Sequence, residues 1–105
     1  MYGAQMPQHG QLDLIAQHNP MQFLIPGNCI IEIDGYPAPR PWGRWVFDLA
    51  PGNHMLRVWF PYMGSSGLAA MSVPIQPGWA TMVRYDTPFF VFMSGSLQML
   101  GSRPM

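Results

Sequence analysis

The chain has 105 residues, enough for one domain with a modest hydrophobic core. Charged residues make up only 10%, against roughly 25% in typical soluble domains, and five basic residues balance five acidic ones. The basic residues are all arginines, and the zero net charge argues against the electropositive surface that binds nucleic acid or an anionic membrane.

Apolar residues make up 49% of the chain, a high share that has two interpretations. Either the protein is a compact domain with an ordinary core, or part of its apolar surface is covered by a partner or by a second copy. We favour the second interpretation, because four Trp, four Tyr, six Phe and ten Met are more than a core of this size easily absorbs. A neutral surface also tends to associate.

Residues 1–20 are rich in Gln, His and Pro and are predicted to form a partly flexible N-terminal arm. Leu12, Asp13 and Leu14 alternate with the period of a strand. The arm is therefore expected to be partly ordered, as a short edge strand, a docking segment or an ordered tail. The domain itself is predicted to occupy residues 21–105, and residues 23–25 are a candidate first strand.

The clearest strand signal lies at residues 29–34. Ile31 and Ile33 alternate there with two acidic residues, which is the pattern of a half-buried strand in an antiparallel sheet. The Asp34-Gly35 pair then predicts a tight turn. Prolines alternate over residues 37–41, and because proline cannot donate a ladder hydrogen bond, this stretch is predicted to be a loop or an edge.

The middle of the chain repeats strand and turn signals. The Gly64-Ser65-Ser66-Gly67 sequence predicts a flexible loop tip, and the Pro-Gly pairs at 51–52 and 77–78 predict turns. Between these breaks, apolar side chains recur at every second position over several stretches. These are residues 44–49, 54–60, 70–76 and 80–85.

After Pro88, residues 89–93 form a very apolar run. We favour a buried strand there; the alternative is an edge strand that pairs with another copy or with a partner chain. Residues 97–100 are predicted to add a last short strand. Together these signals give about six to eight strands spaced by about ten residues, which predicts an all-β fold, a single antiparallel β-sandwich.

Four segments also carry a family resemblance: Ile-Glu-Ile-Asp-Gly-Tyr-Pro (31–37), Asp-Leu-Ala-Pro-Gly-Asn-His (48–54), Leu-Arg-Val (56–58) and Val-Pro-Ile-Gln-Pro-Gly (73–78). Their order resembles the PEGA-type β-sandwich, which is immunoglobulin-like. The Asp-Gly-Tyr-Pro and Pro-Trp-Gly segments are also similar to those of small uncharacterised actinobacterial proteins. The resemblance spans residues 29–86 and implies a non-catalytic accessory or surface module. The proline-rich loop and the apolar extension after Pro88 depart from that pattern.

Few residues are candidates for chemistry. The three histidines have no metal-ligand partner at useful spacing and Cys29 is the only cysteine, so neither a metal site, a cofactor nor an internal disulfide is predicted. Glu32 and Asp34 share a strand face, as paired catalytic carboxylates do. Asp34 is, however, explained by its turn, and Glu32 is predicted to form an ion pair with Arg57 or Arg84. We therefore predict no enzymatic activity.

The aromatic residues are the more informative set, because Trp, Tyr and Arg are enriched at binding hot spots. We predict a non-enzymatic interaction or scaffold module that self-associates or docks on a larger assembly. The alternative is a carbohydrate- or peptide-binding module that stacks its ligand on Trp42, Trp45 or Trp59. Capping of the open sandwich ends by Trp42 and Trp79 is the structural explanation. The interface candidates are Tyr36, Trp42, Trp45, Arg57, Trp59, Phe90 and Phe92.

The sequence also leads to an expected location. Residues 1–10 lack the basic and apolar regions of a signal peptide, and no apolar run approaches the length of a membrane-spanning helix. The single Cys29 suits a reducing compartment or a buried thiol. A cytoplasmic protein without a transmembrane segment is therefore expected.

Overall fold

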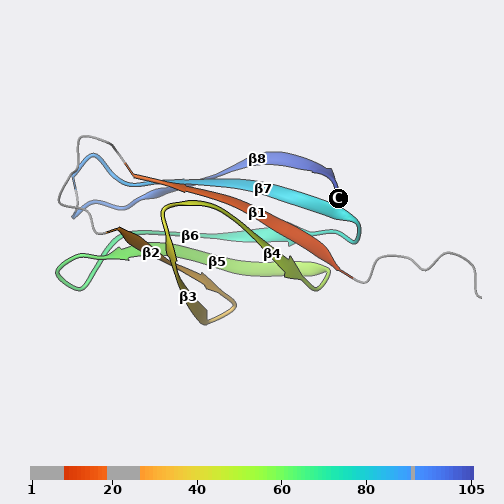
Figure 1. The fold of residues 1–105 in the computed structure, drawn as a ribbon, viewed down its shortest axis with the longest axis horizontal. Helices are drawn as coiled ribbons and strands as arrows, with labels where there is room; N and C mark the ends of the chain where they lie inside the picture. Colours follow the sequence, from red (N-terminus) through yellow and green to blue (C-terminus); the bar gives the residue numbers. More distant parts are fainter. Residues whose placement is uncertain (1–8, 19–26, 91) are drawn as a thin grey trace, which may run out of the picture.

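A computed structural model describes residues 9–18, 27–90 and 92–105 of the protein (Figure 1). Within these residues every regular element is a β-strand, as alternating apolar side chains and frequent Pro and Gly require. The eight strands are β1 (Gly10–Gln17), β2 (Asn28–Ile33), β3 (Tyr36–Pro41), β4 (Gly43–Leu49), β5 (Gly52–Pro61), β6 (Ser65–Ile75), β7 (Trp79–Asp86) and β8 (Ser96–Pro104).

The strands form two four-stranded sheets that pack face to face, so the predicted all-β sandwich is confirmed (Figure 1). The first sheet has the order β4-β1-β7-β8 and the second has the order β3-β2-β5-β6. All neighbours are antiparallel except β1 and β7, which run parallel. This one pair departs from the predicted antiparallel arrangement. The parallel pairing arises because all four strands of the second sheet lie between β1 and β7 in the chain. Strand β7 then enters the first sheet from the same end as β1.

The core lies between the sheets and is built by alternation along each strand. Ile31, Leu56, Val58 and Val83 have no more than 1% of their surface exposed, while their neighbours along the chain face outward. The predicted inward faces of residues 29–34, 44–49, 54–60 and 80–85 are confirmed by this burial pattern. Each fully buried side chain of this size stabilises the fold by about 1.5–3 kcal/mol relative to an exposed one.

The sandwich begins at β1, so the predicted boundary at residue 21 is wrong. Strand β1 lies between β4 and β7, and its Leu12, Leu14 and Ala16 are at most 1% exposed. Because this segment is short and lies in a polar stretch, its sequence predicts an N-terminal arm. It becomes a central strand because both of its edges find partners far away in the chain.

Strand β3 carries three prolines and lies at the edge of the second sheet, which confirms the edge prediction for residues 37–41. The chain then crosses to the first sheet through Trp42 and Gly43. Gly43 has a φ of 144°, a conformation that favours glycine. The Trp42 ring stacks on the Tyr85 ring at 6.2 Å with an interplanar angle of 17°, which packs this corner onto the core.

The structure corrects one predicted loop, one predicted strand and the length of the last strand. Ser65, Ser66 and Gly67 belong to β6, and the last two are buried, so the predicted flexible loop tip is shifted to residues 62–64. Of residues 89–93, the four that are described lie in a loop and are 56–75% exposed, so neither the buried strand nor the edge strand is formed. The last strand is longer than predicted. The candidate strand at residues 23–25 lies outside the described residues.

Within the described ranges, the fold offers no helix with the length and hydrophobicity needed to cross a bilayer.

Candidate functional site

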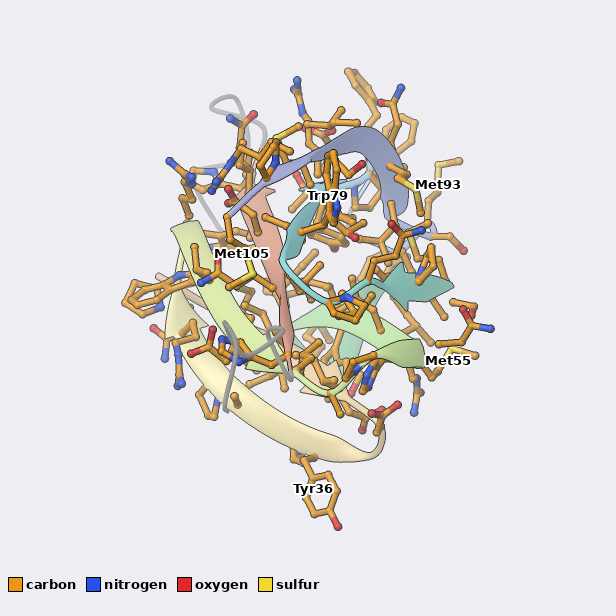
Figure 2. The ribbon with its side chains drawn as sticks, turned by 90° about the vertical axis from the view of Figure 1, so that its right-hand side faces the viewer. Tyr36, Met55, Trp79, Met93 and Met105 are labelled. Carbon is orange, nitrogen blue, oxygen red and sulfur yellow. The ribbon has the colours of Figure 1, made fainter. Side chains whose placement is uncertain are left out.

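The structure does not gather all the predicted interface residues into one surface. Tyr36 projects from the β2–β3 turn and is 79% exposed (Figure 2). Arg57 and Trp59 lie on the outer face of β5, where they alternate with buried Val58. The remaining candidates lie elsewhere: Trp42 at the β3–β4 corner, Trp45 in β4, and Phe90 and Phe92 in the loop between β7 and β8.

Trp42 and Trp45 pack against the core, in agreement with the structural explanation for Trp42. The Trp45 indole N–H donates to the Pro41 carbonyl at 2.8 Å, and the Arg40 guanidinium lies 5.6 Å from the Trp45 ring centroid. Trp59 faces the other way, outward from the second sheet. The three tryptophans of the ligand-stacking alternative therefore do not share one platform.

The outer face of the second sheet carries a local ion pair. Glu32 and Arg57 are cross-strand neighbours, and their Oε2 and Nη1 atoms are 3.0 Å apart. Arg57 also lies over the Trp59 ring at 5.6 Å. The Glu32–Arg57 prediction is confirmed, whereas Arg84 pairs with Asp86 instead. Since Arg57 is 43% exposed, this cross-strand pair contributes about 0.2–1 kcal/mol to stability.

Asp34 and His54 form a clasp between two turns. The His54 Nδ1 lies 2.5 Å from Asp34 Oδ2, and its Nε2 lies 2.6 Å from the Ala50 carbonyl oxygen. The Met55 N–H donates to the other carboxylate oxygen. Two acceptors facing both ring nitrogens favour the imidazolium, so the Ala50 carbonyl and then Asp34 raise the pKa of His54. In turn, the hydrogen bond from His54 lowers the pKa of Asp34. With both ring nitrogens engaged, His54 is structural.

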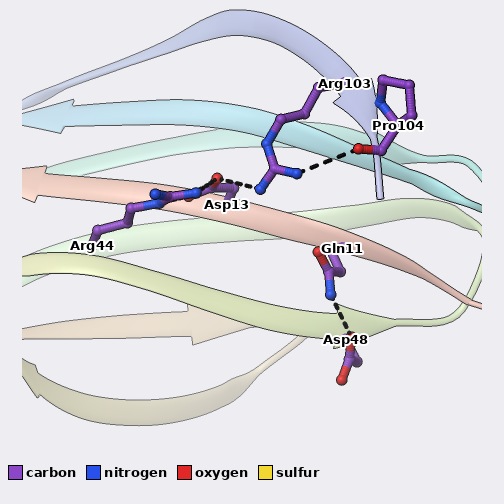
Figure 3. A network of polar contacts seen from close by, with 6 residues as sticks. All are labelled: Gln11, Asp13, Arg44, Asp48, Arg103 and Pro104. Carbon is purple, nitrogen blue, oxygen red and sulfur yellow. Dashed lines mark hydrogen bonds and ion pairs between the residues drawn. The ribbon is translucent and has the colours of Figure 1, made fainter.

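The sequence did not single out Asp13 as a site, yet Asp13 is the most buried acid among the described residues, 4% exposed on the outer face of β1. Arg44 holds both carboxylate oxygens, at 2.7 and 2.5 Å, and Arg103 adds a contact at 3.1 Å (Figure 3). The Arg44 hydrogen bonds are the largest influence and lower the pKa of Asp13. The three side chains join β4, β1 and β8 across a sheet surface, which is a structural role.

Cys29 is buried and its thiol donates to the Arg40 carbonyl at 3.5 Å. Burial raises the pKa of this thiol to about 11, so the reactive thiolate is scarce at neutral pH. Across the described residues, the acids, histidines and cysteine form no group of three that could hold a metal ion.

The β5–β6 turn and the loop between β7 and β8 lie at the same end of the sandwich (Figure 1). Six of the exposed large apolar side chains belong to these two connections or to the start of β6. Tyr62 and Phe92 contact across these two connections with ring centroids 6.3 Å apart, and Phe89 packs edge-on against Phe90 at 4.9 Å. We call this surface the aromatic tip. It comprises Tyr62, Met63, Leu68, Phe89, Phe90, Phe92 and Met93.

The two connections of the aromatic tip have defined backbone conformations. In the β5–β6 turn, Met63 and Gly64 take φ values of 49° and 97°, and the Ser66 hydroxyl donates to the Tyr62 carbonyl at 2.7 Å. In the other loop, the Met93 N–H donates to the Phe90 carbonyl at 3.0 Å, which closes a turn.

The base of the aromatic tip is packed to contact distance. The Tyr85 hydroxyl rises from the core and donates to the Gly67 carbonyl at 2.5 Å, and the Gly95 N–H donates to the Leu68 carbonyl at 3.2 Å. A Cβ added at Gly95 would lie 2.4 Å from the Gly67 oxygen, so only glycine permits this approach. The exposed aromatics thus stand on a closely packed base.

A hollow of about 230 Å³ opens at the aromatic tip, and residues of the tip form its walls. Met63, Leu68, Phe92 and Met93 supply its apolar walls, together with serines and Gly67. Residues 58–83 and 87–102 contain no charged residue and no histidine, and the charges that separate these runs, Arg84 and Asp86, pair with each other at the end of β7. Sequence reasoning found the apolar run 89–93, with Phe90 and Phe92 as interface candidates, but its interface candidates did not include Tyr62, Met63 and Leu68. The long uncharged run on either side of residues 84–86 is the signal that could have found them.

No family model, curated protein or solved structure matches this chain, so the PEGA resemblance stays a prediction.

Proposed function

We propose that this protein is a non-enzymatic protein-interaction module whose contact surface is the aromatic tip. The observation that carries the proposal is the exposed fraction of six apolar side chains that touch one another or share one hollow. At about 200 Å² for a fully exposed residue of this size, they present about 780 Å² of surface. The largest apolar patch on a typical monomer is about 300–600 Å².

The chemistry of the other polar sites supports the same proposal. The buried or short polar contacts of Asp13, His54 and Glu32 end on partners within the fold, and each joins neighbouring strands or turns. An apolar surface on a closely packed base needs little ordering when it binds, which lowers the entropic cost of association.

Photo-crosslinking in the native host tests the proposal. A benzoylphenylalanine placed at Phe92 is expected to yield covalent protein adducts, because this side chain lies in the contact surface. The same group at Tyr36 is the matched control, since Tyr36 is as exposed but lies on the β2–β3 turn, at the other end of the strands. Adducts at position 92 and not at 36 support the proposal. Equal yields at both positions, or none at 92, would contradict it.

A further inference from the structure

Resting on the proposed function, we infer that the partner is a second copy of this chain. The two copies dock tip to tip about a twofold axis, and the Phe90 ring of each enters the hollow at the aromatic tip of the other.

The first support is that the surface carries both halves of a complementary contact. Phe90 is 62% exposed and does not line the hollow, so it is a projecting side chain beside a depression. A cavity of about 150 Å³ lined by apolar side chains holds a benzene molecule. The hollow of about 230 Å³ is open to solvent and three serines share its lining, but its volume is large enough for one phenyl ring. In a twofold dimer such a pair of features is used twice, because the same patch on both copies meets itself.

The second support is the area. The six exposed residues of the aromatic tip offer about 780 Å², and a stable interface of standard size buries about 800 Å² per partner. The apolar area already present therefore nearly suffices for a specific dimer. The aromatic and methionine side chains that make up most of it are the residue types enriched in interface cores.

The third support is the charge distribution. Two identical surfaces repel each other when they carry net charge, but the connections that form the aromatic tip contain no charged residue. The same absence disfavours a lipid surface as occupant, because stable membrane docking by one apolar loop needs a second signal, which is commonly a cluster of basic residues. The chain has no lysine, and its arginines lie outside residues 58–83 and 87–102.

Sedimentation equilibrium over a wide concentration series tests the inference with three variants. Phe90→Ala removes the projecting ring, and Ser65→Trp fills the hollow from an exposed position on its wall. Tyr36→Ala is the control, which removes an equally exposed aromatic ring on the β2–β3 turn. We expect a wild-type dimer, and each tip variant should raise the dimer dissociation constant at least about tenfold, as for a hot spot. Tyr36→Ala should leave the constant unchanged.

The other outcomes overturn the inference in distinguishable ways. A dimer that both tip variants leave intact would mean that another surface mediates self-association. A monomer at every concentration would exclude the second copy, and adducts to a different protein at position 92 would then preserve the proposed function while the inference fails. A monomer that co-sediments with phosphatidylcholine vesicles, and loses that binding in Phe90→Ala, would identify a lipid surface instead. A monomer with neither adducts nor vesicle binding would overturn both proposals.

Discussion

The two ends of the sandwich are built from the same strands but are closed in different ways. At one end, short turns join β2 to β3, β4 to β5 and β6 to β7, and the His54–Asp34 clasp joins two of them (Figure 1). At the other end, nine residues (87–95) separate β7 from β8, and most of the large side chains there are apolar and exposed. At the first end Asp34 and His54 satisfy each other's polar groups, whereas the second end leaves a group of apolar side chains exposed.

Exposed apolar side chains are not confined to the aromatic tip, and two of them, Trp79 and Met99, line a second hollow between β7 and β8. Tyr36, Met55, Trp79 and Met105 project in separate directions around the end with the short turns (Figure 2). Isolated exposed apolar residues are normal on protein surfaces and need no functional explanation. The aromatic tip differs in number, because six exposed apolar side chains gather there over a closely packed base. Four predictions test this difference.

The largest effect is expected in the core that both ends share. Leu14→Ala removes a fully buried side chain of β1 and should lower the free energy of unfolding by about 3 kcal/mol. Urea denaturation measures the change. Val46→Ala is the matched control on the neighbouring strand, because Val46 is 47% exposed and should cost less than about 0.5 kcal/mol. Equal effects of the two variants would contradict the central position of β1.

The next effect concerns the base of the aromatic tip. Gly67→Ala places a Cβ 2.3 Å from the buried Phe60 ring at a φ of 66°, so crowding and backbone strain act together. We expect a loss of about 2 kcal/mol in the free energy of unfolding. Gly27→Ala is the control, since a Cβ there meets nothing within 4 Å. If Gly67→Ala were neutral by urea denaturation, the base would be looser than the structure shows.

A smaller, pH-dependent effect is expected at the opposite end. The folded state raises the pKa of His54 above its ordinary value near 6.5, so its stabilisation is complete below that value and is lost as the pH rises through the folded pKa. The pKa of Asp34 is lowered, so its contribution is present above about 4 and is lost as the pH falls further. The clasp should therefore stabilise the fold most between these limits.

Unfolding measured at pH 6 and at pH 8.5 isolates the histidine half of this effect. The wild type should lose stability between the two pH values, and His54→Gln should lose less because glutamine does not titrate. His9→Gln is the control, as His9 approaches Asp48 only at 3.5 Å and is about half exposed. Parallel pH profiles for wild type and His54→Gln would rule out the imidazolium clasp.

The smallest effect on stability is expected at the aromatic tip itself. Phe90→Ser combined with Phe92→Ser should change the free energy of unfolding of the monomer by no more than about 0.5 kcal/mol per site, because both rings are already in water. Phe60→Ala, which empties a fully buried site, should cost about 3–5 kcal/mol in the same urea experiment. A large loss in the double variant would mean that the tip aromatics stabilise the fold rather than await a partner.

Much of the fold was predictable because strand signals are local. Apolar residues at every second position marked the inward faces of β2, β4, β5 and β7, and Asp34-Gly35 marked its hairpin turn. The central place of β1 was not predictable, since Leu12 and Leu14 look the same whether they pair with one strand or two. The aromatic tip was predicted only in part, because an apolar run such as residues 89–93 fits a buried strand equally well.

The amino-acid sequence by itself determined the strand-rich class, the inward face of most strands and the low charge of the surface. These properties follow from the side-chain period of a strand, from turn residues and from composition. Only the tertiary structure decided that β1 and β7 pair in parallel, that Asp13 is enclosed by Arg44 and Arg103, and that Phe90 and Phe92 stay exposed. Each of these depends on which distant segment covers a side chain. The close contact of Gly67, Tyr85 and Gly95 occupies the space at the end of the core, so the aromatic rings beyond it remain outside.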